Sequence, residues 1–288
     1  MARTPRPRSQ PRRPPSPGGG GGGGGPRRRG APPARRSAAA RGLGGDQVEG
    51  RQAVRELLLA GRRKVRELWI ASEDGDRGPA DLLALAAELR VPVQQVSRKR
   101  LDAEARSEAP QGVLAKAAPL QETDLDDLAR GSANRPPFLV LVDGVTDPGN
   151  LGAILRSVDG AGGTGIVLPR HRAVHITPTA AKAAAGAIEH VPIAVVSGLP
   201  TAIERLRRAG VWVVGLDDRA TQSLFELGDT ATEPIALVLG AEGSGLSRLV
   251  RERCDVLVSI PMQGQLSSLN VSAAAALACY EVTRRRVV

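Results

Sequence analysis

The sequence predicts an α/β fold in which a parallel sheet carries helices on both faces. From Phe138 onward, short apolar runs alternate with segments of helical periodicity, as in a parallel sheet joined by crossover helices. Three of the strand-to-helix turns in this half are polar and contain glycine. A shorter α/β pattern occupies residues 46–118. Together these observations predict a large α/β domain over residues 137–288, preceded by a small one.

The apolar runs of residues 137–288 define the strands of the larger sheet, and the periodic segments between them define its helices. Strands are expected at 138–142, 165–168, 191–196, 211–216, 235–239 and 256–260. Helices are expected at 150–160, 179–187, 201–208, 246–253 and 268–286.

Residues 46–118 form the smaller unit, which is long enough for a modest core of its own. It opens with an amphipathic helix at 49–60, where Val54, Leu57 and Leu58 share one face. The remaining elements are expected as strands at 67–71, 91–96 and 112–117 and helices at 80–89 and 99–105. The polar, acidic stretch 119–136 is typical of a linker.

Residues 1–45 are predicted to be a disordered basic tail. They hold 11 Arg and no Asp or Glu, whereas the rest of the chain carries 29 basic and 30 acidic groups and is nearly neutral. Eight consecutive glycines (18–25) and many prolines oppose any regular structure there. Because arginine binds phosphate without sequence preference, the tail is either a nonspecific RNA arm or solvated chain without a binding role. A cytoplasmic location is expected, with organellar import as the alternative.

Motifs of several common enzyme classes are missing or misplaced. Residues 160–165 match G-x-G-x-x-G, but a helix precedes them and a strand follows, so they indicate a helix end and not a dinucleotide site. His171 and His175 lack supporting ligands, and no metal site is predicted. Cys254 and Cys279 are expected to be buried thiols in a reducing compartment. No apolar run reaches the roughly 18 residues that span a bilayer.

The three polar turns cover residues 142–152, 239–246 and 260–272. Each follows a predicted strand, and ligands of open α/β sheets bind beyond the carboxyl ends of the strands. One site assembled from three loops is therefore expected.

The same loops carry a family resemblance. Residues 143–157 (DGVTDPGNLGAILRS), 239–246 (LGAEGSGL) and 260–274 (IPMQGQLSSLNVSAA) resemble, in order and spacing, the three motifs of the SpoU (TrmH) family of RNA ribose 2′-O-methyltransferases. The resemblance covers about residues 137–286.

The smaller unit resembles the substrate-binding domain of RlmB-type members of that family, which methylate a guanosine of large-subunit rRNA. The likeness rests on residues 49–58 (EGRQAVRELL) and 111–115 (QGVLA). Arg51 departs from the pattern, because many members have histidine there.

The resemblance implies a C-terminal SPOUT-type trefoil knot, a rare exception to the rule against knotted chains. It also implies a homodimer and a bound S-adenosylmethionine. By the match, the backbone at Gly240, Ile260 and Leu269 would hold the adenine of that cofactor and its surroundings. Tight loops suit this role, since an adenine edge is neutral and needs backbone donors and acceptors.

The resemblance also implies five catalytic residues, listed here: Arg156, Asn150, Glu242, Ser268 and Asn270. The matching arginine is the family's key catalytic residue, often proposed as a base. Because arginine is essentially always protonated, clamping the target phosphate and stabilising the developing alkoxide is the easier role. Asn150 would orient Arg156 or cap the helix, and Ser268 would adjoin the substrate ribose or act as a cap. Glu242 would hydrogen-bond Arg156 or the cofactor.

The expected function is methyl transfer from S-adenosylmethionine to a ribose 2′-hydroxyl of RNA, with a guanosine of 23S rRNA as the expected target. The alternatives within the family are a tRNA ribose methyltransferase and an antibiotic-resistance rRNA methyltransferase. A non-catalytic RNA-binding factor in ribosome assembly is the alternative from another class. Neither composition nor pattern predicts a membrane partner.

Overall fold

The computed structural model describes residues 43–72, 79–132, 135–171 and 176–287. The predicted tail lies outside the described residues, apart from its last three positions, and so does His175. None of the described helices is long and apolar enough to cross a membrane.

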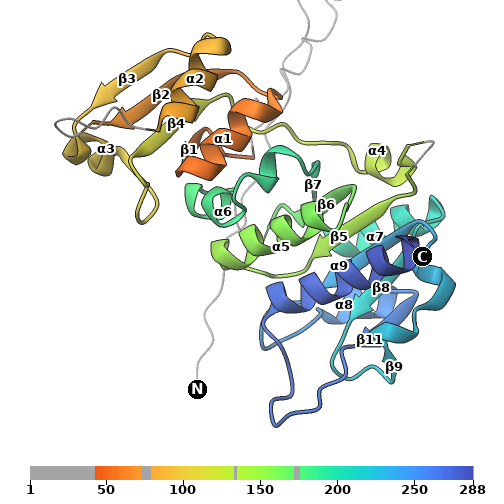
Figure 1. Cartoon of the computed structure of the whole chain (residues 1–288). Helices are drawn as coiled ribbons and strands as arrows, with labels where there is room; N and C mark the ends of the chain where they lie inside the picture. Colours follow the sequence, from red (N-terminus) through yellow and green to blue (C-terminus); the bar gives the residue numbers. More distant parts are fainter. Residues whose placement is uncertain (1–42, 73–78, 133–134, 172–175, 288) are drawn as a thin grey trace, which may run out of the picture. The chain divides into compact units, whose positions relative to one another are not determined.

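The smaller unit is built on a mixed four-stranded sheet (Figure 1). Its strand order is β1 (Gln47–Glu49), β4 (Val113–Ala117), β2 (Val65–Ala71) and β3 (Val93–Val96). The pair β2–β3 is parallel and the other two pairs are antiparallel. Two helices, α1 (Arg51–Ala60) and α2 (Ala80–Glu88), share one apolar cluster with the sheet, while α3 (Arg98–Glu104) shares a second cluster around Trp69.

The larger sheet has seven strands, and every pairing between them is parallel. Its order is β7 (Ile193–Val196), β6 (Gly165–Pro169), β5 (Phe138–Val142), β10 (Ile235–Leu239), β8 (Trp212–Leu216), β11 (Val256–Ser259) and β9 (Gln222–Ser223). The central strands β5 and β10 are continuous apolar runs, because helices cover both of their faces. The parallel α/β architecture expected from the sequence is therefore confirmed.

Two apolar clusters, one on each face, show how the helices are placed. Alternate residues of β5 enter different clusters. Phe138 and Val140 pack with α5 (Pro148–Gly160) and α9 (Val271–Val287), whereas Leu139 and Leu141 pack with α4 (Leu125–Arg130), α7 (Leu199–Arg208) and α8 (Arg248–Arg253). The helices of this domain are α5 (Pro148–Gly160), α6 (Pro178–Ala183), α7 (Leu199–Arg208), α8 (Arg248–Arg253) and α9 (Val271–Val287). Short 3₁₀ helices occur at Ala187–Glu189, Leu224–Glu226 and Gly228–Ala231.

The stretch expected to be a linker is partly folded. It contains α4 (Leu125–Arg130), which buries Leu125 and Leu128 in the cluster of α7 and is capped by the Asp124 carboxylate, which accepts from the Asp126 amide at 2.7 Å. A helix of six residues is too short to produce a clear periodicity, so the sequence did not reveal it.

The last residues of the expected tail are also packed. Leu43 is buried in the core of the larger domain, and the Gly45 amide donates to the Ile176 carbonyl at 3.2 Å. Residues 43–45, which were assigned to the disordered tail 1–45, are therefore part of the folded chain.

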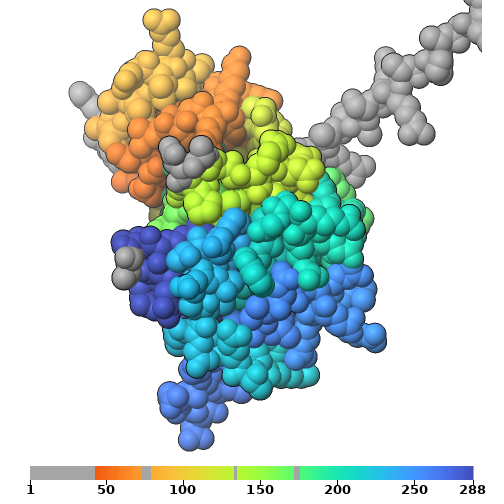
Figure 2. Space-filling model, turned by 90° about the vertical axis from the view of Figure 1, so that its right-hand side faces the viewer, coloured from red at the N-terminus to blue at the C-terminus, as the bar shows by residue number. Residues whose placement is uncertain are grey.

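The C-terminal helix is fixed at its far end by one arginine. Arg286 donates to the carbonyls of Ala231, Pro137 and Glu233 at 3.0, 3.1 and 2.7 Å. The segment between β11 and α9 runs out from the domain as a long loop (Figure 1) and protrudes in the turned view (Figure 2).

Candidate active site

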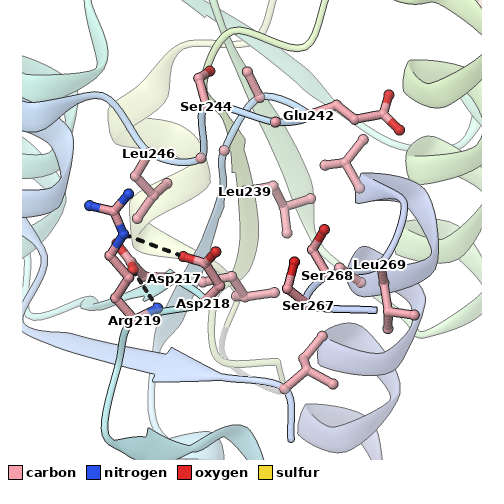
Figure 3. Close-up of a pocket in the computed structure, with 18 of the residues that line it drawn as sticks. Asp217, Asp218, Arg219, Leu239, Glu242, Ser244, Leu246, Ser267, Ser268 and Leu269 are labelled. Carbon is pink, nitrogen blue, oxygen red and sulfur yellow. Dashed lines mark hydrogen bonds and ion pairs between the residues drawn. The ribbon is translucent and has the colours of Figure 1, made fainter. Parts of the chain in front are cut away.

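A cavity of about 400 Å³ opens beyond the carboxyl ends of β8, β10 and β11 (Figure 3). Three loops form its walls: 216–219 after β8, 239–246 after β10 and residues between 260 and 271 after β11. All three residues that the resemblance assigns to the cofactor (Gly240, Ile260 and Leu269) line this cavity. Its size lies in the range of small-molecule sites, and its lining mixes apolar side chains with loop backbone, which suits a nucleoside.

The loop after β10 requires glycine at its first position. A Cβ atom on Gly240 would lie 2.5 Å from the Leu246 amide nitrogen and closer still to Gly245, and both contacts are with backbone. The loop closes on itself through paired hydrogen bonds, Ala241 amide to Gly245 carbonyl at 3.0 Å and the reverse at 2.9 Å. The cavity wall is thus a tight turn of fixed shape.

A polar network joins two of the loops to α5 beside the cavity. The Glu242 carboxylate accepts from the side-chain amides of Asn150 and Asn270, each at 3.4 Å. The Asn270 amide also donates to Asn150 Oδ1 at 3.1 Å. Asn150 lies in the first turn of α5 and Asn270 directly precedes α9, so the carboxylate faces the positive ends of two helix dipoles. The structure therefore brings three of the five predicted catalytic side chains together.

The caps of both helices differ from expectation. Asp147, not Asn150, caps α5: its carboxylate accepts from the Asn150 amide at 2.6 Å, with Pro148 at the first helical position. Asn270, not Ser268, caps α9, accepting from the Ser272 amide at 2.8 Å. The final helix therefore begins at Val271 and not near Ser268. Ser268 stays in the loop, where it lines the cavity.

Arg156 stands apart from this network. It is exposed on α5, does not line the cavity, and makes no hydrogen bond or ion pair with another described residue. Positions six apart on an α-helix differ by about 120° around its axis, since each residue advances about 100°. Arg156 and Asn150 accordingly face different directions, and Asn150 pairs with Glu242 instead.

Sequence reasoning missed the cavity wall formed by Asp217, Asp218 and Arg219, together with Arg251 from α8. Asp217 is buried, and its carboxylate accepts from the Arg219 amide at 2.9 Å and pairs with Arg251 Nε at 3.0 Å. The sequence offered one indication of this wall, which is that the segment follows the carboxyl end of a strand, as the other two loops do. It lacks the glycines that drew attention to them.

The thiol near this region is inactive. Burial raises the pKa of the Cys254 thiol to about 12, and the carboxylates of Asp255 and Asp143 add to the effect. Within the described ranges no group of three His, Cys, Asp or Glu side chains is placed to hold a metal ion. The site therefore offers backbone, amides and carboxylates to a ligand.

Comparison with known proteins gives two family matches. Residues 137–280 match the model described as the SpoU rRNA Methylase family. Residues 47–123 match the model described as RNA 2′-O ribose methyltransferase substrate binding.

Individual relatives agree with these matches. The 23S rRNA (guanosine-2′-O-)-methyltransferase RlmB of Pseudomonas putida is 40% identical over 84% of this chain and 98% of its own length. A Bacillus subtilis relative, whose name gives a TrmH family methyltransferase of tRNA or rRNA, is 42% identical over 84% and 96%.

Solved structures are also similar to most of the chain. The SpoU methyltransferase AviRb of Streptomyces viridochromogenes, in complex with the cofactor AdoMet, superposes with a TM-score of 0.67 at 31% identity, covering 84% of this chain and 90% of its own. The full-length relatives and the match over residues 137–280 lead to one conclusion: the chain belongs to the SpoU rRNA methylase family.

Proposed function

We propose that this protein methylates the ribose 2′-hydroxyl of a guanosine in 23S rRNA. As a member of the SpoU family it is an S-adenosylmethionine-dependent RNA methyltransferase. The observation that carries the site assignment is the meeting of three family motifs, with Asn150, Glu242 and Asn270 in one network beside a nucleoside-sized cavity. The substrate assignment rests on the RlmB relatives and on the substrate-binding match over residues 47–123.

The residues fit the cofactor: Gly240, Ile260 and Leu269 present loop backbone to the cavity, where an adenine edge would find donors and acceptors. When bound, the cofactor supplies an electrophilic sulfonium methyl. The transfer breaks the methyl carbon–sulfur bond and forms a bond to the ribose O2′, and the hydroxyl proton is released.

The protein residues position the hydroxyl and balance its charge. Asn270 and Ser268 lie at the cavity and are suited to hold the ribose, and Glu242 fixes the orientation of Asn270 and Asn150. Arg156 is a fixed cation on an exposed helix face. Because it lies outside the cavity lining, it is suited to clamp the phosphate next to the target nucleotide.

The finer architecture that we propose includes the trefoil knot. The segment after β11 lies beside the loops after β8 and β10 at the cavity, and α9 then packs back on α5. These contacts place the segment where a threaded chain would pass, and they support the proposal.

We also propose a homodimer. Leu277 and Tyr280 of α9 are 41% and 53% exposed, and the Tyr280 hydroxyl lies beside Gly160 at the end of α5. Two apolar side chains on a helix next to the site favour a second copy as the partner. Sedimentation should show a dimer, and Tyr280→Glu should shift it toward monomer.

An rRNA substrate further supports the cytoplasm as its location.

The test is transfer of labelled methyl from S-adenosylmethionine to 23S rRNA and, separately, to bulk tRNA, followed by identification of the nucleoside. We expect 2′-O-methylguanosine in 23S rRNA. Label in tRNA would agree with the proposed methyl transfer but would contradict 23S rRNA as the substrate. The name of the Bacillus subtilis relative allows for that outcome. No label in either RNA despite cofactor binding would indicate a substrate met during ribosome assembly. No label together with no cofactor binding would favour the non-catalytic assembly factor.

A further inference from the structure

The loop after β8 places two adjacent carboxylates on the cavity wall. Asp217 and Asp218 follow Leu216 directly, and both line the cavity. In Figure 3 they lie across the cavity from Ser268 and Leu269. None of the three family motifs includes them, and the chemistry described above does not use them.

The two carboxylates have different environments. Asp217 has a side chain that is only 7% exposed and is engaged by Arg251 and by the Arg219 amide. It therefore fixes the loop and attaches it to α8. Its charge is compensated before any ligand enters.

Asp218 is available to a ligand. Its side chain is 64% exposed, and its one ion-pair partner among the described residues is Arg219, with Nε at 4.0 Å. An exposed pair at that distance contributes little to stability. The structure thus holds a weakly paired negative charge at the edge of a cavity that also contains apolar surface.

We propose that Asp218 selects the positively charged cofactor over its neutral-sulfur product. S-adenosylmethionine and S-adenosylhomocysteine share the adenosine and the amino acid; they differ in the methyl group and in the sulfonium charge. A carboxylate on the wall of a partly solvated cavity would attract a sulfonium bound within its reach and would be indifferent to a neutral sulfur at the same place. This inference rests on the proposed assignment of the cavity as the cofactor site.

The selection has a functional meaning. Methyl transfer removes the positive charge from sulfur, so the contact with Asp218 is lost as the product forms. A site that distinguishes the two ligands by charge can bind S-adenosylmethionine and release S-adenosylhomocysteine, although both make the same backbone contacts.

The experiment is titration calorimetry of the full chain with S-adenosylmethionine and, separately, S-adenosylhomocysteine. Asp218→Asn should weaken S-adenosylmethionine binding about three- to tenfold, with less than a twofold change for S-adenosylhomocysteine. Asp229→Asn, which removes the same charge from an exposed residue outside the cavity lining, should change neither. Equal weakening of both ligands would mean a contact with a group they share, and no change for either would mean no contact; both results overturn the proposal.

A second variant separates this inference from the site assignment. Ala274 is half-buried in the first turn of α9 and lines the cavity, so Ala274→Phe should reduce the binding of both ligands strongly. If it leaves both affinities unchanged, the cavity is not the cofactor site, and the assignment falls together with the role of Asp218. If it abolishes binding while Asp218→Asn has no effect, only the role of Asp218 falls.

Discussion

Replacing Gly152 by alanine tests how closely α5 must approach its neighbour to hold the site. A Cβ atom there would lie 2.6 Å from the Ala180 carbonyl oxygen, 2.8 Å from the Ala184 amide nitrogen, and closer still to the Ala183 methyl. None of these atoms can rotate away, so α5 must retreat from α6 by about 1.0 Å to restore an ordinary contact of 3.4 Å with the Ala183 Cβ, the nearest of them. Overpacking of this kind costs about 3 kcal/mol, and the better helix propensity of alanine returns about 1 kcal/mol.

The net loss of about 2 kcal/mol corresponds to a fall in Tm of about 4–8 °C for a chain of this size. Thermal unfolding followed by circular dichroism measures it. The matched control is Gly160→Ala at the end of the same helix, where the nearest atom is the movable Tyr280 hydroxyl at 3.0 Å, and no loss of Tm is expected. A Gly152→Ala protein as stable as the wild type would refute the argument that backbone contact fixes α5.

Four further predictions concern the site and the tail. Arg156→Ala should abolish methyl transfer and leave cofactor affinity nearly intact, because the arginine lies outside the cavity lining; loss of binding in calorimetry would indicate a structural role. Glu242→Gln should lower the transfer rate about tenfold or more with little change in stability, since one asparagine amide loses its acceptor; rates equal to wild type would dismiss the network. Cys279 is buried and Cys254 is half-buried, and burial raises the pKa of each thiol to about 12. Both should resist a thiol reagent at pH 8 until the chain is denatured, and fast labelling of native Cys279 would contradict its burial. Removal of residues 1–42 should weaken RNA binding chiefly at low salt; affinity that is unchanged from low to physiological salt excludes an RNA arm.

The architecture of the larger domain was accessible from the sequence because its strands are unbroken apolar runs. Runs such as 138–142 and 235–239 are buried on both faces, so neither strand depends on a subtle periodicity. The loop after β10 was equally accessible, because Gly240 lies where only glycine fits.

The relations between distant segments were less accessible. The partners of Asn150 depend on β5 and β10 being neighbours in the sheet, which local pattern does not encode. The angular separation of Asn150 and Arg156, by contrast, follows from helix geometry alone and could have been computed in advance. The residues around Asp217 have no sequence pattern that distinguishes them from any other polar loop after a strand.

The central pairing of the larger sheet joins segments that are far apart along the chain. Val140 of β5 lies opposite Leu237 of β10, with close to 100 residues between them. Closing a loop of about 100 residues costs on the order of 4 kcal/mol of chain entropy before the contacts repay it. Folding should therefore be slow, and β5 should wait for its partner with its apolar surface uncovered. Asn150 and Glu242 follow these two strands along the chain. During refolding, cofactor binding should therefore return no sooner than β5 pairs with β10, and the recovery of binding reports when that pairing has formed.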